Sequence, residues 1–205
     1  HKMKIDKGDL QFRNVVYSLI KNEKRGKLLD IGPGRGQITK MYHNLNFEIS
    51  CVDIDPSVLE FKEVSCKKAD MNFDKLPFKD ESFDYVMCTE ILEHLENPYN
   101  LIREASRVLK KGGKLITSSP YTGSLIQKIY YLFTGFFLRF TKNPKVGGHI
   151  TPINWHLLKH MFRENNLKIE KITYNRGWLP ILRIELPKNK LWGDVIIIKT
   201  KKDEK

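Results

Sequence analysis

Apolar residues along this chain follow two periods, and their alternation predicts strands separated by helices. The run 195–198 is short, continuous and made of Val and Ile, which is typical of a buried strand. The stretch 10–20 instead places apolar residues every three or four positions, which is typical of an amphipathic helix. The predicted strands are 27–31, 48–52, 64–69, 83–88, 114–118, 167–174 and 195–198. The predicted helices are 10–20, the stretch from Ile38 to Tyr42, 57–63, 98–109 and the stretch from Trp155 to Phe162.

Strands that alternate with helices predict an α/β fold, in which a parallel sheet is covered on both faces. The last two predicted strands are joined without a convincing helix, which predicts an antiparallel hairpin at the edge of the sheet. Gly112 and Gly113 are expected to end the helix 98–109. At 205 residues the chain suits one domain, 1–205, with an insertion at 121–152 between a strand and the next helix.

Composition narrows the class of protein. The longest apolar stretch, 125–140, is interrupted by polar and charged residues and is too short to span a bilayer. The N-terminus shows no apolar signal region, and the three cysteines lack CxxC spacing. We therefore expect reduced, buried thiols and a cytoplasmic protein. The net charge of +12 is spread along the chain, which favours a solvated basic surface and leaves contact with nucleic acid or an anionic membrane open.

The strongest local signal is the stretch 28–36, a short strand that runs into a glycine-rich turn. Its glycines are Gly32, Gly34 and Gly36, and the next predicted strand is followed by Asp53. This spacing fits a βαβ unit that binds a nucleotide-like cofactor, because glycine lets the backbone approach the ligand and the acid receives ribose hydroxyls. The third glycine comes one residue earlier than in the G-x-G-x-x-G pattern of dinucleotide sites.

A G-x-G-x-G turn after an acidic strand end resembles motif I of the class I S-adenosylmethionine (SAM) methyltransferases. Further blocks follow in the order and spacing of the small members of that class, which include quinone-biosynthesis enzymes. The resemblance implies a Rossmann-like sheet of seven strands, mostly parallel with an antiparallel last strand, and SAM as the cofactor. The blocks are 69–71, 76–78, 83–84, 89–95 and 107–113.

The chemistry of SAM gives each matching position a role. Backbone N–H groups around Gly34 and Gly36, at a helix N-terminus, suit the carboxylate of the methionine end. Asp30 is placed to receive the ammonium group, and Asp53 to accept hydrogen bonds from both ribose hydroxyls. Glu90 follows the fourth strand, beside the sulfonium region.

The adenine ring is assigned to three further residues. Asp70 is expected to accept a hydrogen bond from the amino group of adenine, while Ile54 and Met71 supply apolar faces for the ring. Structural alternatives stay open, because Asp70 would also start a turn before Asn72, and Ile54 and Met71 would be ordinary core residues in any α/β protein. Asp55 is interpreted as a helix cap.

The sequence points less sharply to the residues that handle the acceptor. His94 and His149 are the candidates for a general base, and Tyr121 for orienting the acceptor, although a structural role is the commoner one for a single histidine. The six histidines are dispersed and no carboxylates have metal-ligand spacing, so we expect no metal site.

The insertion 121–152 carries apolar and aromatic residues at helical spacing, with Gly135 expected to interrupt the helix. Two interpretations stand level. One is a cap packed on the domain's own core. The other is a lid for a small or lipid-linked acceptor, or a peripheral membrane contact through 125–145, flanked by Arg139, Lys142 and Lys145.

The block 147–152 resembles methyltransferases of surface-glycan synthesis, which adds a glycan-linked acceptor to the candidates. The sequence therefore predicts SAM-dependent methylation of a small, lipid- or glycan-linked acceptor, at oxygen. One alternative is RNA methylation, which the charge permits; however, the block 89–92 differs from the Asn/Asp-Pro-Pro-Tyr block of exocyclic-amine methylation. The others are a non-catalytic SAM-binding module and a nicotinamide dehydrogenase.

Overall fold

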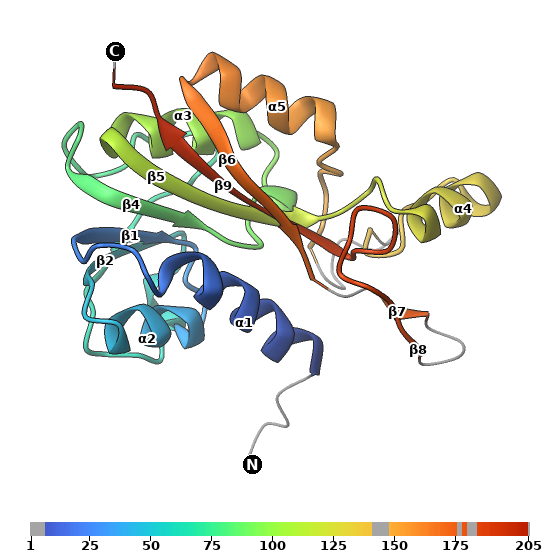
Figure 1. Cartoon of the computed structure of the whole chain (residues 1–205). Coiled ribbons are helices and arrows are strands. Elements are labelled where there is room, and N and C mark those ends of the chain that lie inside the picture. Colours follow the sequence, from blue (N-terminus) through green and yellow to red (C-terminus); the bar gives the residue numbers. More distant parts are fainter. Residues whose placement is uncertain (1–6, 141–147, 176–177, 180–183, 205) are drawn as a thin grey trace.

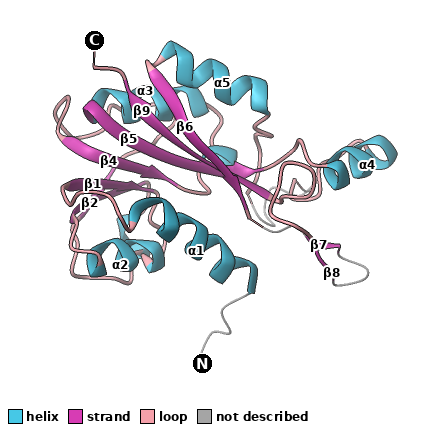
Figure 2. Cartoon of the chain, viewed as in Figure 1, coloured by secondary structure: helices cyan, strands magenta, loops and turns pink. Residues whose placement is uncertain are grey.

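The computed structural model describes residues 7–140, 148–175, 178–179 and 184–204. A seven-stranded sheet runs through the molecule with helices on both faces (Figures 1 and 2). Its strand order is β3-β2-β1-β4-β5-β9-β6. The strands are β1 (Lys27–Ile31), β2 (Glu48–Asp53), β3 (Cys66–Lys68), β4 (Phe83–Cys88), β5 (Leu109–Pro120), β6 (Leu167–Tyr174) and β9 (Val195–Lys202).

Strands β1 to β5 are parallel to one another, whereas β9 is antiparallel to both β5 and β6. The last strand is thus inserted between two others, and β6 forms the edge. Both the predicted fold class and the antiparallel pairing of the last two strands are confirmed.

Side chains that alternate across each strand divide the interior into two cores. In β4, Val86 and Cys88 point to one face of the sheet, and Tyr85 and Met87 point to the other. Helices α1 (Lys7–Ile20) and α2 (Gln37–Asn44) cover the second of these faces, while α3 (Pro98–Val108) and α5 (Trp155–Glu164) cover the first (Figure 1).

Three predicted boundaries were wrong. The helix expected at 57–63 is a single 3-10 turn, Pro56–Val58, because the Glu60 N–H donates to the carbonyl of Arg35 rather than within a helix. Strand β5 begins at Leu109, so Gly112 and Gly113 lie inside the strand instead of ending the helix. Leu109 pairs with Phe83 before a register shift, which explains this early start. The strand expected at 64–69 is shorter, at β3.

Helix α4 (Leu125–Thr134) lies at one end of the molecule, beyond the sheet, near the small pair β7 (Trp178–Leu179) and β8 (Ile184–Glu185) (Figure 1). It ends at Gly135, whose φ of 72° confirms the predicted interruption. Lys142 and Lys145 of the predicted membrane contact lie outside the described residues. Within the described part of the chain, every helix is too short or too polar to cross a membrane.

An ion-pair network fastens the segment after α1 to the sheet. The carboxylate of Glu23 accepts hydrogen bonds from Lys114, at 2.7 Å, and from Lys199. Lys199 is buried on β9 and also donates to the carbonyl of Leu19, at 3.2 Å. Burial acts to raise the pKa of Glu23, but the two lysines outweigh it and hold the pKa below its usual value.

Replacing Glu23 with Gln should therefore destabilise the fold by about 2 kcal/mol near neutral pH, because Lys199 keeps its charge without an anionic partner. Urea unfolding checks this. Since the folded-state pKa is lowered, the contribution of Glu23 is present at neutral pH and is lost as the pH falls through that pKa. The difference between wild type and Glu23→Gln should accordingly narrow in acid. Glu170→Gln is the matched control, because Glu170 lies farther from Lys114, at 3.9 Å.

Candidate functional site

Four of the predicted site residues lie along one edge of the sheet, where the parallel strands end. Asp53 is the last residue of β2, Gly32 follows β1, and Asp70 and Glu90 lie two residues beyond β3 and β4. Because these strands are neighbours in the order β3-β2-β1-β4, the four residues form a row. This is the edge at which α/β sheets bind ligands.

The glycine-rich turn has the backbone that its sequence predicts. Gly32, Gly34 and Gly36 have φ values of 68°, 53° and 84°, which disfavour other residues. A Cβ atom at Gly36 would lie 2.6 Å from Cδ1 of Leu59, whereas one at Gly34 would meet nothing within 4 Å. The turn leads directly into α2, whose first N–H groups form a site suited to an anion.

A cavity of about 510 Å³ opens beside this turn. It brings together three predicted residues, Asp30, Gly32 and Glu90, with side chains from α1 and from the end of the insertion. Its lining also includes Asp9, Arg13, Arg35, Arg139, Asn175 and Asp194.

Asp30 is only 2% exposed, although its side chain contributes to the cavity wall. Burial raises its pKa to about 7, opposed by a 2.7 Å hydrogen bond that the Thr39 hydroxyl donates to Oδ2. A buried carboxyl with one neutral donor is suited to a cationic ligand group, which would favour its charged form. The cavity therefore fits the ammonium end of SAM.

The structure places the predicted ribose and adenine residues farther along the same edge. Oδ1 of Asp53 accepts a hydrogen bond from the N–H of Asp55, at 3.0 Å, and Ile54 is 57% exposed. Asp55 caps the 3-10 turn by accepting from the N–H of Ser57, as its cap interpretation predicts. Asp53 and Ile54 thus face solvent beside the glycine turn, where a nucleoside could lie.

The placement of Asp70 and Met71 agrees better with their structural alternatives, a turn and core packing, than with contact to adenine. Oδ1 of Asp70 accepts a hydrogen bond from the N–H of Asn72, at 2.9 Å, which is the turn that the sequence left open. Met71 is 4% exposed and belongs to the core beneath α3. Its predicted contact with adenine does not match this placement, because the side chain points into the domain.

Glu90 is held in a strained, half-buried position. Its φ is 53°, unusual for a residue with a side chain, and its N–H donates to Oγ of Ser118, at 2.9 Å. Oε2 lies 3.3 Å from Arg139 Nη2, and Arg139 Nη1 lies 3.5 Å from Asp194. Burial raises the pKa of Glu90, and the charge of Arg139 opposes this. Arg139 therefore connects the insertion to the wall of the cavity.

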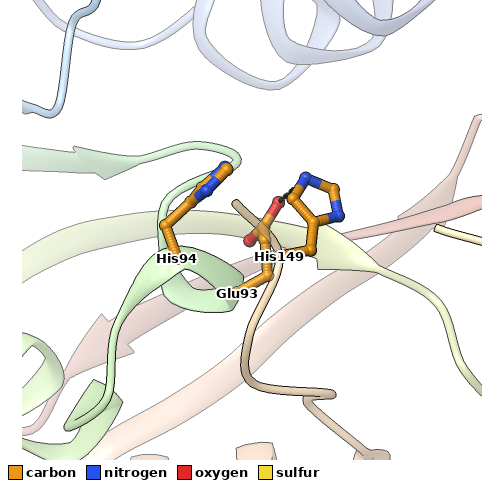
Figure 3. Close-up of side chains that lie close together, drawn as sticks. All are labelled: Glu93, His94 and His149. Carbon is orange, nitrogen blue, oxygen red and sulfur yellow. Dashed lines mark ion pairs between the residues drawn. The ribbon is translucent and has the colours of Figure 1, made fainter. Parts of the chain in front are cut away.

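Three residues that sequence reasoning did not bring together meet next to Glu90. Figure 3 shows the cluster formed by Glu93, His94 and His149, with Oε1 of Glu93 4.0 Å from Nε2 of His149. One ligand atom from each lies within 4.8 Å of the others. The sequence shows no such grouping, because residues far apart in sequence converge only in the fold. Glu93 was missed altogether.

Backbone hydrogen bonds fix this convergence. The carbonyl of Glu93 accepts from the N–H groups of Ile150, at 2.8 Å, and Thr151, at 3.1 Å. Nδ1 of His94 lies 3.0 Å from the carbonyl oxygen of Gly148. The adjacent Glu93 and His94 were the available signal in the sequence, but the position of His149 follows only from the fold.

The predicted role of Tyr121 does not match its placement. Its side chain is 5% exposed, its ring lies 5.1 Å from that of Tyr174, and it is absent from the lining of the cavity beside Asp30. Burial raises its pKa. Tyr121 is therefore placed as a core residue.

Comparisons with known proteins agree with this geometry. Residues 29–117 match a family described as a methyltransferase domain. The chain is 34% identical over 126 residues to an uncharacterised protein of Methanocaldococcus jannaschii, covering 61% of this chain and 60% of that protein. It is 30% identical over 101 residues to a ubiquinone biosynthesis O-methyltransferase of Xanthomonas oryzae, covering 45% of this chain and 42% of the relative. The chain thus spans about half the length of these relatives.

The fold matches a crystal structure from Thermotoga maritima described as a SAM-dependent methyltransferase, possible histamine N-methyltransferase. The TM-score is 0.70 at 23% identity, over 95% of this chain and 89% of that one. Residues 29–117 thus match a methyltransferase domain, and the fold agrees with that of a solved SAM-dependent methyltransferase. Both likenesses point to SAM as the cofactor.

Asp53→Ala should lower the affinity for S-adenosylhomocysteine roughly 100-fold, since two charge-assisted hydrogen bonds to ribose would be lost. Calorimetric titration of the folded protein measures this. Asp55→Ala is the matched control, because Asp55 caps the neighbouring turn, and its affinity should stay near that of wild type. Equal binding by wild type and Asp53→Ala would contradict the ribose assignment.

The glycine turn offers a second paired test. Gly36→Ala should destabilise the fold by about 2 kcal/mol, because the new Cβ would clash with Leu59 in a backbone conformation that alanine disfavours. In Gly34→Ala the new Cβ would meet no atom within 4 Å, so the variant should lose about 1 kcal/mol of stability, from backbone strain alone. Chemical unfolding of the two variants side by side checks the order, and equal losses would argue against the close packing at Gly36.

Proposed function

We propose that the protein transfers the methyl group of SAM to a hydroxyl oxygen of a lipid-linked acceptor at an anionic membrane surface, in the cytoplasm. The likeness to a ubiquinone biosynthesis O-methyltransferase supports oxygen as the acceptor atom and a lipid as its carrier. The three free cysteines support a reducing compartment.

When bound, SAM supplies an electrophilic methyl group: the carbon–sulfur bond breaks, its electron pair stays on sulfur, and the acceptor oxygen forms the new bond to carbon. The residues of this chain would do three things. Asp30 and the glycine turn would hold the methionine end, and Glu90 and Arg139 would form the wall beside the reacting atoms. The hydroxyl proton would leave toward His149 or His94, the predicted bases.

The observation that carries this proposal is the apolar surface of α4. Leu132 and Phe133 are 79% and 81% exposed, far more than expected of a helix that caps its own core. Their exposure favours the lid or membrane interpretation of the insertion over core packing. The other apolar residues exposed on or beside this helix are Ile129, Tyr130, Tyr131, Phe136 and Leu191.

Charge and shape beside α4 support an anionic lipid surface. Lys128 is exposed on the helix, and Lys188 and Lys190 are exposed on the loop that reaches its first turn, where the N–H of Leu125 donates to the carbonyl of Leu191. Such lysines favour negatively charged lipid headgroups. A second cavity, of about 530 Å³, lies between α4 and the start of α5 and suits a lipid tail. Its apolar lining is Tyr131, Leu132, Phe137 and Trp155.

Vesicle flotation tests whether the apolar surface of α4 binds anionic membranes. Wild type should float with vesicles that contain phosphatidylglycerol and much less with pure phosphatidylcholine, because binding combines apolar insertion with charge attraction. The double variant Leu132→Ser, Phe133→Ser should lose this binding. Ile169→Ser, on edge strand β6, is the control for an exposed isoleucine and should bind as wild type does. Equal flotation of all three proteins would contradict the assignment.

A transfer assay tests the reaction. With SAM labelled at the methyl group, label should enter the lipid-extractable fraction of a membrane extract and should depend on Asp53. Alkali-stable label on a lipid product would support an ether oxygen. Label in RNA instead, or tight S-adenosylhomocysteine binding without transfer to any fraction, would contradict the proposal in favour of RNA methylation or a non-catalytic SAM-binding module.

A further inference from the structure

Glu93 is a buried acid without a hydrogen-bond partner in the described part of the chain. Its side chain is 0% exposed, and none of the described residues forms a hydrogen bond to either carboxylate oxygen. Nδ1 of His149, beside it, is likewise buried without a hydrogen-bond partner among those residues. Unpaired polar atoms in the interior are costly, and the exceptions in a protein commonly mark a functional group or a binding site for an ion.

The two histidines offer nitrogen ligands to the same point. A carbonyl oxygen can only accept, so the contact of 3.0 Å to Gly148 makes Nδ1 of His94 the donor. The lone pair of this imidazole is then on Nε2. A second ring nitrogen that donates to a backbone carbonyl is the usual way in which proteins orient a metal-binding histidine. The His94 and His149 rings lie close together, with centroids 4.7 Å apart.

We propose that Glu93, His94 and His149 bind one divalent transition-metal ion (Figure 3). Two imidazoles and one carboxylate suit ions such as Zn²⁺, Mn²⁺ or Fe²⁺, whereas Mg²⁺ and Ca²⁺ prefer oxygen ligands. Three protein ligands leave coordination positions open, as in catalytic rather than structural metal sites. His94 is exposed, so an ion can reach the cluster from solvent.

The position of the cluster suggests what the open positions bind. Glu90 lines the cavity beside the glycine turn and lies only three residues before Glu93 in the chain. On the other side of the cluster, His149 packs against Phe140, which follows Arg139 of the cavity wall. An acceptor oxygen on the ion would therefore lie near the methyl group. This part rests on the proposed function: with both histidines bound to the metal ion, the ion would lower the pKa of the acceptor hydroxyl, and the proton would leave to solvent instead of to a histidine base.

Binding of the metal alone tests the site without any assay of activity. Untagged, chelator-treated full chain is titrated with Mn²⁺ and followed by electron paramagnetic resonance. We expect one ion per chain, displaced by Zn²⁺ and not by an equal concentration of Mg²⁺. Glu93→Gln and His149→Ala should each weaken Mn²⁺ binding at least roughly tenfold.

His160→Ala is the matched control, because His160 also lies near a carboxylate, 3.9 Å from Glu164, but at an exposed pair on α5. Mn²⁺ binding that is absent, or equal in wild type and Glu93→Gln, would overturn the inference. Calorimetry with S-adenosylhomocysteine on the same samples separates the two proposals: cofactor binding without Mn²⁺ binding refutes the metal site alone. A thermal stabilisation by Mn²⁺ that disappears in Glu93→Gln would guard against a folding defect as the explanation.

Discussion

The cost of buried negative charge governs the carboxyl edge of this sheet. Asp30 and Glu93 are buried there, Glu90 and Asp194 are half-buried, and burial raises the pKa of each of the four. For Asp30 and Glu93 the pKa reaches about 7 and about 8. Acids in this condition require cations or protons nearby. This need for a nearby cation or proton links three features of the edge: the glycine turn, the insertion and the histidine cluster.

Arg139 supplies the cation for two of these acids. Its guanidinium lies between Glu90 and Asp194, and its charge opposes the effect of burial on both. Asp30 has the Thr39 hydroxyl instead, which is a neutral donor, so the ammonium group of SAM would complete its environment. Glu93 has no hydrogen-bond donor on either oxygen among the described residues, and the proposed metal ion would complete its environment. Each of the four acids would thereby have a cation beside it.

Local spacing in the sequence was enough to predict the parts of this edge that depend on backbone conformation. The glycine turn and the carboxylate of Asp53 lie within one βαβ unit, so the chain between them fixes their separation. The direction in which a side chain points depends instead on tertiary packing. Met71 and Tyr121 point into the core because α3 and Tyr174 pack against them, which the sequence pattern does not reveal. Glu93 meets His149 only because the last part of the insertion returns to this edge of the sheet.

Four consecutive residues connect the regions that the proposed reaction needs. Phe137 stacks on Tyr131, 4.8 Å between centroids, and lines the apolar cavity beside α4. Arg139 lines the cavity beside the glycine turn, and the ring centroid of Phe140 lies 5.5 Å from that of His149. Under the proposed function, the lipid surface and the two sites beside the sheet would therefore be joined by this short segment, whose ends are both packed against other aromatic rings.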